Sequence, residues 1–353
     1  MTTEALGVSL QYSHSMGRGE FAGPGFRNPV AMARGDNDLM YVVNRSYEYR
    51  PDGKRVTICT VDEEYIGEFA RGVHTAGVTD IVTEDGSLIW PTSVALDKEG
   101  NVYIADEWLN RISIFTKDGE WIGKWGTEGS GDGNINKPSG MVFDSDDNMI
   151  MVDSQNNRVQ KLTKEGKFIS SFGSQGTGHG ELNLPWGIDL DVNDNIYVAD
   201  WRNARIQKFP PDGNFITAWG RIGHGTGEYL QNGDLARVDV DNNGFVYVRE
   251  FDGGRIQKYT EDGKYVATFS RRGVGEGELD EGYGLSVIDG KLYCPDTFES
   301  RVQVFSLDGE LLEAEELDAI DREAETALLL SLIHISAPTR RYAISYAVFC
   351  LKK

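Results

Sequence analysis

The sequence predicts an all-β protein that is built from repeated antiparallel units of four short strands. One pattern recurs along the chain at a spacing of about 47 residues, and each copy carries an arginine just after its second apolar run. Each copy divides into four alternating runs rich in β-branched and aromatic residues, separated by turns that contain Asp, Asn or Gly. No window before residue 312 shows the apolar period of a helix. The recurring arginines are Arg111, Arg158, Arg205, Arg255 and Arg301.

The copy from Pro185 to Gly220 shows the unit most clearly. Its strands are expected in GIDLD, NIYVAD, RIQKF and FITAWG, and its turns DVND and PPDG place Asp, Asn and Gly where tight turns need them. Counting the starts of the first strand in each copy gives six units. These starts lie near Pro29, Pro91, Pro138, Pro185, Asp234 and Tyr283.

The two ends of the repeat array complement each other. Residues 7–29 match the second half of a unit, whereas the last copy supplies only three strands. If the first segment pairs with the last copy, the ring closes and no strand edge stays open where the array starts and stops. The predicted fold is therefore a six-bladed β-propeller of four-stranded antiparallel blades, closed by the N-terminal strand pairing with the last blade.

The repeat array defines one domain over residues 1–312. Residues 313–330 are expected to form a short amphipathic helix. Residues 331–353 contain no acid in a chain with 56 Asp and Glu, and they resemble the run that translated sequencing-adapter DNA produces. We expect this tail to be non-native or disordered, the alternative being a native basic tail. Truncation at Leu330 should then leave the fold and the activity unchanged.

The composition narrows the partners and the location. The formal net charge of −21 argues against nucleic acid and against an anionic membrane, because both attract basic surfaces. The three cysteines lie far apart in sequence, so neither a disulfide framework nor a cysteine zinc site is expected. The first residues lack the apolar core of a signal peptide, and no apolar run reaches about 18 residues. We expect a monomeric, cytoplasmic protein, or a secreted one if a leader was removed.

The repeated motif resembles a known family. The pattern PxGxxxDxxxNIYVADxxNxRIQKF, with FG or WG and a GxGxGEL loop, is similar to the NHL repeat over about residues 7–312. Proteins with this repeat include tripartite-motif proteins, bacterial stand-alone propellers and peptidyl-amidoglycolate lyases, so the resemblance implies a propeller but no single chemistry. The amidating lyases hold zinc with histidines near the first strand of a blade. Here the matching positions carry Thr92, Ser139 and Trp186, so no metal or other cofactor is predicted, with a calcium ion in the axial channel as the one alternative.

One face of the ring is expected to carry the functional residues. The loop from the fourth strand to the next blade and the loop from the second to the third strand emerge on this face and differ between copies. Aromatic side chains and arginines there suit a ligand with a planar or apolar body and an anionic group. The structural alternative is that the tryptophans pack one blade against the next. The candidate ligand-binding residues are Arg45, Tyr47, Trp108, Trp186, Trp201, Arg202, Arg249 and Tyr283.

Repetition separates structural positions from candidate functional ones. An acid precedes each recurring arginine by five residues, and a pair that occurs in five copies is expected to be a staple within the blade. Arg249, by contrast, stands where the sister copies have Ala105, Val152 and Ala199, which favours a role in a single site. The repeated acids are Asp106, Asp153, Asp200, Glu250 and Asp296.

Two functions remain open at this point. The first is a binding module that recognises a small molecule, a peptide or a protein through the variable face, which is favoured because the sequence contains no recognisable catalytic motif. The alternative is a propeller lyase or hydrolase that acts on a small anionic substrate at the mouth of the axial channel. In that case Arg45, Arg202 or Arg249 would hold the substrate, and Tyr47 or Tyr283 would serve as acid or base. RNA binding, as in some tripartite-motif proteins, conflicts with the acidic composition.

Overall fold

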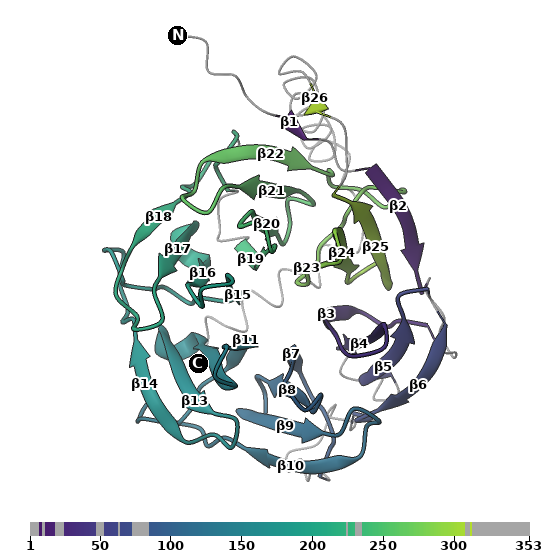
Figure 1. The fold of residues 1–353 in the computed structure, drawn as a ribbon, viewed down its shortest axis with the longest axis vertical. Helices are drawn as coiled ribbons and strands as arrows, with labels where there is room; N and C mark the ends of the chain where they lie inside the picture. Colours follow the sequence, from purple (N-terminus) through teal and green to yellow (C-terminus); the bar gives the residue numbers. More distant parts are fainter. Residues whose placement is uncertain are drawn as a thin grey trace, which may run out of the picture.

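The computed structural model describes residues 7–8, 11–17, 25–46, 53–62, 64–72, 85–223, 225–229, 235–307 and 311–312. Within them the chain forms a closed ring of six four-stranded antiparallel sheets, or blades, around a central axis (Figure 1). The predicted six-bladed β-propeller is thus confirmed. No helix in these ranges is long and apolar enough to cross a membrane. The helix and the tail expected after residue 312 lie outside the described residues.

Each blade runs from an inner strand near the axis to an outer strand at the rim (Figure 1). Blade 1 contains β3 (Pro29–Arg34), β4 (Leu39–Asn44), β5 (Arg55–Thr60) and β6 (Tyr65–Phe69). Blade 2 contains β7 (Pro91–Leu96), β8 (Val102–Asp106), β9 (Arg111–Phe115) and β10 (Trp121–Trp125). Blade 3 contains β11 (Pro138–Phe143), β12 (Asn148–Asp153), β13 (Arg158–Thr163) and β14 (Phe168–Phe172), with the short 3-10 helix η2 (Ser154–Asn156) after β12.

The second half of the ring repeats this order. Blade 4 contains β15 (Ile188–Leu190), β16 (Ile196–Asp200), β17 (Arg205–Phe209) and β18 (Thr217–Trp219), with the 3-10 helix η3 (Trp201–Asn203) after β16. Blade 5 contains β19 (Leu235–Val240), β20 (Val246–Glu250), β21 (Ile256–Tyr259) and β22 (Tyr265–Phe269). Blade 6 contains β23 (Ser286–Ile288), β24 (Lys291–Asp296), β25 (Arg301–Ser306) and β2 (Gln11–Met16).

The N-terminal strand completes the last blade, as predicted. β2 pairs antiparallel with β25, so that Gln11 lies opposite Ser306 and Met16 opposite Val302 (Figure 1). The side chain of Met16 is 1% exposed and belongs to a buried cluster with Val302 and Val304. The short strand β1 (Gly7–Val8) also pairs with β26 (Leu311–Leu312), which joins the two ends of the array a second time.

A buried acid and an arginine join the second and third strands in four blades. Arg205 Nε donates to Asp200 Oδ2 at 2.8 Å, and the same fully buried carboxylate accepts bonds from the backbone N of Asn183 at 2.7 Å and from Gln207 Nε2 at 3.0 Å. A carboxylate removed from water needs such partners to remain charged. Equivalent pairs are Arg158–Asp153, Arg255–Glu250 and Arg301–Asp296.

The glycine-rich loops close on themselves. Glu181 Oε2 accepts a bond from Gly178 N at 2.8 Å, and Glu228 and Glu278 make the same bond to Gly225 and Gly275 at 3.0 Å. The glutamate of the GEL motif therefore satisfies a backbone N–H group of its own loop. Because these N–H groups are already bonded and no helix follows, the loops do not form an anion cradle.

Two inner strands begin later than the sequence predicts. Regular pairing starts at Ile188 in β15 and at Ser286 in β23, three residues after the expected starts at Pro185 and Tyr283. Before β15, Trp186 N still donates to the Ala199 carbonyl at 2.9 Å. Trp186 and Tyr283 consequently stand just outside the regular strands, at one end of the axis.

Candidate functional site

Aromatic side chains from four blades meet at one end of the ring axis. They lie either just before an inner strand or just after a second strand. These are the two kinds of loop that the sequence predicts to carry blade-specific residues. We call this group the aromatic mouth. It consists of Trp90 and Trp108 of blade 2, Trp186 and Trp201 of blade 4, Phe251 of blade 5 and Tyr283 of blade 6.

Ring contacts link blades 4, 5 and 6 across the mouth. The ring centroids of Trp186 and Tyr283 are 5.8 Å apart, and those of Phe251 and Tyr283 are 4.6 Å apart. Trp201 extends the chain outward, with its centroid 6.0 Å from that of Trp186. Since Trp186 and Tyr283 belong to blades that are not neighbours, their contact brings two parts of the ring together at the axis. Aromatic pairs at such distances attract each other beyond their buried area.

Arg45 connects this row of aromatic rings to the aromatic pair of blade 2. Its guanidinium carbon lies 4.6 Å from the ring centroid of Trp90 and 5.7 Å from that of Tyr283. Trp90 in turn packs edge-on against Trp108 at 5.5 Å. Arg45 also forms an ion pair with Glu107, and both side chains are 10% exposed. The charge of Arg45 is therefore already balanced, and its position holds three blades together at the mouth.

Arg202 lies at the opposite end of this row of aromatic rings, and it differs from Arg45 in its exposure and in its ion pairing. Its guanidinium carbon lies 4.6 Å from the ring centroid of Trp201, and the side chain is exposed. Within the described residues it has no carboxylate within 4 Å. Stacking on an indole orients the guanidinium and leaves its N–H groups directed toward solvent. Arg202 is thus a cation at the mouth that can receive an anion.

The structure brings six of the eight predicted site residues into this connected group. Trp108 is 48% exposed and Phe298, on the equivalent loop of blade 6, is 45% exposed, so both offer apolar surface to a partner. Tyr47 lies outside the described residues. The predicted residues that meet are Arg45, Trp108, Trp186, Trp201, Arg202 and Tyr283.

Arg249 does not join the mouth, in contrast to the expectation from its unique position. Its side chain is fully buried between blades 5 and 6. Nη1 donates to the carbonyls of Gly284 at 2.8 Å and Pro295 at 2.7 Å, and Nη2 donates to the carbonyl of Asp280 at 3.3 Å. The single exception in the repeat therefore serves packing between blades, and no surface remains on Arg249 for a ligand.

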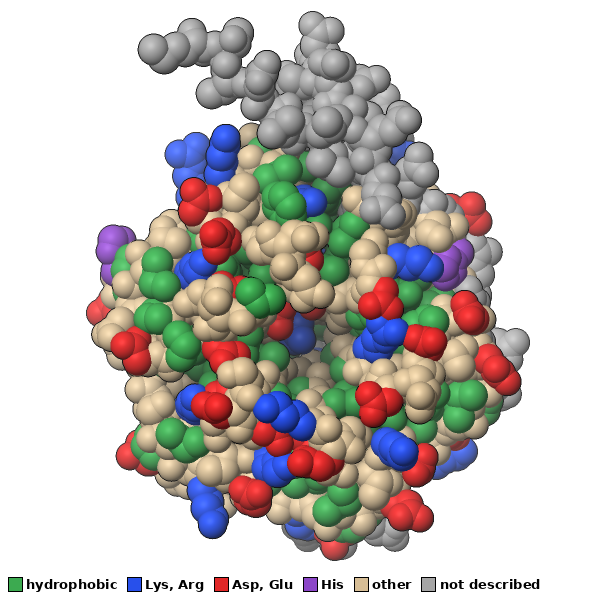
Figure 2. All heavy atoms as spheres, viewed as in Figure 1, with side chains coloured by type: hydrophobic (Ala, Val, Ile, Leu, Met, Phe, Trp, Pro, Cys, Tyr) green, Lys and Arg blue, Asp and Glu red, His purple; other side chains and the backbone are tan. Residues whose placement is uncertain are grey.

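Two acids and an arginine on the inner strands were missed by the sequence reasoning. Asp189 of β15 and Asp239 of β19 have carboxyl groups within hydrogen-bonding reach of each other, and the charge of Arg237 acts on both. These strands line the central hollow that Figure 2 shows, in which side chains of both charges are visible. An alignment of the inner strands of the six blades could have revealed these acids, because the matching residues of the other four blades are not acidic. Those residues are Ala33, Ala95, Val142 and Ser286.

The environment of these acids favours their protonated forms. Burial raises the pKa of Asp189 to about 6, although backbone N–H groups and the charge of Arg237 act in the opposite direction. Burial, followed by the negative charge of Asp189, raises the pKa of Asp239 well above its usual value. Two carboxyl groups in contact cannot both be ionised without strong repulsion, so the pair retains a proton near neutral pH.

One segment of the chain matches a known family model. Residues 182–209, which include β15, β16 and η3, match the NHL repeat. The chain is thus a six-bladed propeller in which one segment, within blade 4 and the loop before it, matches the NHL repeat. No curated protein sequence matches this chain.

Solved structures resemble this propeller in fold. A streptogramin B lyase has a TM-score of 0.55 and 14% identity, over 87% of this chain and 100% of that chain. A virginiamycin B lyase from Staphylococcus aureus has a TM-score of 0.55 and 13% identity, over 84% and 100%. A protein of unknown function from Bacteroides thetaiotaomicron has a TM-score of 0.56 and 18% identity, over 86% and 75%. At these identities the likeness concerns the fold alone.

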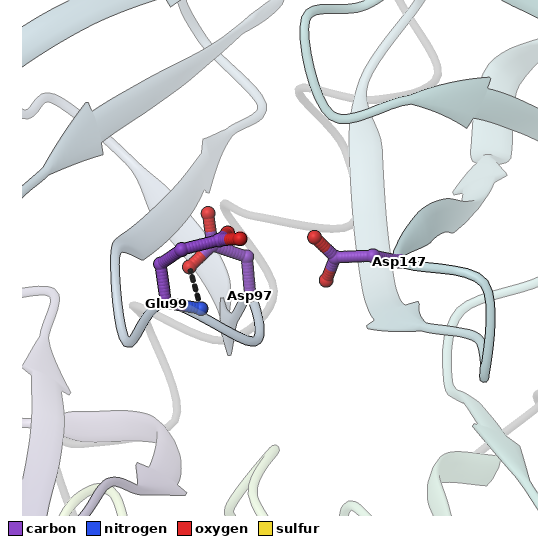
Figure 3. Close-up of side chains that lie close together, drawn as sticks. All are labelled: Asp97, Glu99 and Asp147. Carbon is purple, nitrogen blue, oxygen red and sulfur yellow. Dashed lines mark hydrogen bonds between the residues drawn. The ribbon is translucent and has the colours of Figure 1, made fainter.

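A third group of charged residues lies in the short turns of blades 2 and 3. Asp97, Glu99 and Asp147 have oxygen atoms within 4.8 Å of one another, and Figure 3 shows Asp147 turned toward the other two. Lys164 Nζ lies 2.5 Å from Glu99 Oε2 and 2.9 Å from Asp147 Oδ2, and its bond lowers the pKa of Glu99. The lysine already balances these carboxylates, which join the turns of blades 2 and 3, so we do not assign a metal site here.

Proposed function

We propose that the protein is a ligand-binding propeller whose aromatic mouth takes a small molecule or a peptide group with a flat apolar body and an anionic end. The observation that carries this proposal is the state of Arg202, which is exposed, stacked on Trp201 and without a carboxylate partner in the described part of the chain. A stacked guanidinium loses little conformational freedom when it binds a carboxylate or a phosphate. The adjoining indoles supply apolar surface for the rest of the ligand.

The contrast with Arg45 favours Arg202 as the anion site. Arg45 is enclosed by Trp90 and Tyr283, and Glu107 balances its charge. A ligand would have to displace this carboxylate from a site with little exposure, which costs the pairing of two desolvated charges. Arg202 has no such competitor within the described residues. We therefore assign Arg45 to holding the mouth together and Arg202 to binding the ligand.

The experiment compares a charged probe with its neutral analogue. Binding of 3-phenylpropionate and of 3-phenylpropionamide is followed by tryptophan fluorescence of the protein. In the Arg202→Met variant we expect the Kd of 3-phenylpropionate to rise about 10-fold, equivalent to about 1.4 kcal/mol, because one charge-assisted contact is lost. The Kd of the amide should stay the same.

Arg221→Met is the matched control for this test. Arg221 is another exposed arginine, but it is paired with Glu228 within its own glycine-rich loop and stacks on no aromatic ring among the described contacts. Its replacement should leave the Kd of both probes unchanged. If neither probe gives a saturable signal, or if Arg202→Met binds 3-phenylpropionate as the unchanged protein does, Arg202 is not the anion site.

A second candidate function is a lyase or hydrolase, and the carboxyl pair in the channel favours it. A raised pKa near neutrality suits an acid or a base, and two of the similar folds are described as lyases. A catalytically inactive form of one of them carries a histidine-to-alanine substitution and was solved with quinupristin. Among the described residues, His14 lies on β2 at the rim, and the ring of His179 stacks on that of Phe215 with centroids 4.3 Å apart, so neither histidine belongs to the aromatic mouth. The described histidines give the lyase no support, and we therefore place the binding function first.

Quinupristin provides the direct test of the second candidate. The protein is incubated with this compound, and the reaction is followed by reversed-phase chromatography. A product peak that is lost in the Asp189→Asn variant would favour the lyase. A chromatogram identical to that of quinupristin in buffer would remove this activity and leave the binding function in place.

A further inference from the structure

The carboxyl pair in the channel lies among three inner strands, and Asp189 joins two of them by a hydrogen bond. Asp189 Oδ2 of β15 accepts a bond from the backbone N of Val240 in β19 at 2.7 Å. One blade further on, the carboxyl group of Asp239 in β19 faces the backbone N–H of Val287 in β23, and it lies beside the carboxyl group of Asp189. The edges of inner strands are the least protected backbone groups of a propeller, and Asp189 satisfies one of them across a blade boundary.

Two adjacent blades carry this acidic connection. The other four blades place Ala33, Ala95, Val142 or Ser286 at the matching position of the inner strand. Ser286 makes a comparable link to the next blade with a neutral group, since its hydroxyl donates to the Met32 carbonyl at 3.2 Å. A hydroxyl would therefore serve for the connection itself. The two acids add a response to pH that a serine lacks.

The titratable groups that face the carboxyl pair keep a constant charge between pH 5 and pH 9, so the proton shared by the pair is the main group that titrates there. Arg237 of β19 is the cation that acts on both acids. Tyr197 of β16 faces Asp189, and Tyr247 of β20 and Cys294 of β24 face Asp239. Burial raises the pKa of the Cys294 thiol to about 12 and raises the pKa of both tyrosines, so all three stay neutral between pH 5 and pH 9. An arginine keeps its charge throughout this range.

The pair lies directly below the aromatic mouth. Trp186 precedes Asp189 by three residues on the inner segment of blade 4, and Tyr283 precedes Ser286 by three residues in blade 6. Three residues of extended chain span about 10 Å. The strand of Asp189 thus follows Trp186, the strand that Asp239 faces follows Tyr283, and these two aromatic rings are in contact across the axis.

We propose that Asp189 and Asp239 form a proton-dependent clasp that sets the spacing of Trp186 and Tyr283 and thereby opens or closes the aromatic mouth. With one proton between them, the two carboxyl groups attract each other through an O–H···O⁻ bond. When that proton leaves to solvent, two negative charges face each other and the inner strands of blades 4 and 5 repel, which moves Trp186, at the start of the blade 4 segment, relative to Tyr283 of blade 6. The proposal rests on the proposed function, because it regulates the same mouth.

The direction of the pH dependence follows from the pKa of each acid. Both acids have a higher pKa in the folded chain than in the unfolded chain, so folding binds protons. The stabilisation from the pair is complete below the unfolded pKa, and it is lost as the pH rises through the folded pKa values, from about 6 upward. The mouth should therefore be tight in mildly acidic solution and loose in alkaline solution.

The test uses the ligand-free protein and its Asp239→Asn variant. The asparagine side chain has the same size as aspartate and can donate an N–H to Asp189 at every pH, so the clasp stays closed. Between pH 5 and pH 9 we expect the tryptophan emission of the unchanged protein to shift to longer wavelength, and its melting temperature to fall by about 5 °C relative to the variant. The emission shift should disappear in a Trp186→Phe variant.

Asp194→Asn is the matched control. Asp194 also bonds a backbone N of a neighbouring blade, Ser145 N at 3.0 Å, but it does so in an exposed turn. It should keep the pH profile of the unchanged protein. If the tryptophan emission and the melting temperature of Asp239→Asn change with pH as those of the unchanged protein do, the clasp is overturned. If Asp239→Asn fails to fold, the same comparison is made with Asp189→Asn. Since no ligand is used, a mouth that binds neither phenylpropionate probe but still titrates would remove the proposed function and leave the clasp.

Discussion

Replacement of Arg249 by methionine is expected to lower the free energy of unfolding by about 3 kcal/mol, the largest effect of any single substitution considered for the predicted site. Methionine fills most of the space but cannot donate hydrogen bonds. The carbonyls of Gly284, Pro295 and Asp280 would then stay buried without this donor. Urea unfolding followed by circular dichroism measures the change.

Two opposing effects decide the size of this result. Burial lowers the pKa of Arg249, which shows that the enclosed charge is costly, and its Nε has no partner in the described part of the chain. Removing a buried charge can stabilise a protein when its partner is removed as well. Here the partners are backbone carbonyls that no substitution of Arg249 removes. The loss of three hydrogen bonds therefore outweighs the free energy gained by no longer burying a charge. Arg202→Met, which alters an exposed arginine, should change stability by less than about 0.5 kcal/mol. Equal stability of the two variants would show that the bonds between blades 5 and 6 contribute nothing.

Deletion of residues 1–20 is expected to cost more than any point substitution. It removes β2 and leaves β25 as an open edge in blade 6. The buried cluster that contains Met16, Val302 and Val304 would become exposed. We expect the free energy of unfolding to fall by about 5 kcal/mol or more, and the open edge to promote association. Thermal melting and size-exclusion chromatography measure both effects.

Truncation at the other end provides the comparison for this deletion. Removal of residues 331–353 leaves every described strand in place and should not change the melting temperature. A melting temperature that is also unchanged after deletion of residues 1–20 would show that the ring does not depend on its N-terminal strand.

The features that recur in several blades could be predicted from the sequence, whereas the role of Arg249, which interrupts the repeat in one blade, could not. The strands, the turns and the buried Asp200–Arg205 pair could be predicted because each has counterparts in other blades. The same reasoning read Arg249 as part of a ligand site, because a charge that interrupts a repeat can serve a ligand or a neighbouring blade equally well. The direction of its side chain, which decides between them, depends on how blades 5 and 6 pack.

The channel acids were missed for a related reason. In sequence, Asp189 and Asp239 are separated by a whole blade, and each looks like an ordinary strand residue. Their contact depends on the register of β15 and β19, which are neighbours in the ring but are not hydrogen-bonded as strands of one sheet. The aromatic mouth was easier to anticipate, because loops that emerge on one face of a propeller converge wherever their exact register lies.

The pairing of β2 with β25 also determines the order in which the blades can fold. Each of blades 1 to 5 is formed by one continuous stretch of chain, so its strands can pair soon after synthesis. The contact between Gln11 and Ser306 spans nearly the whole ring, and it cannot form until the last blade has been made (Figure 1). Until then the N-terminal segment and β25 each present an unpaired strand edge. Ring closure is thus the latest step available to the chain, and a neighbouring copy that donates its own first strand during this interval would produce an exchanged dimer.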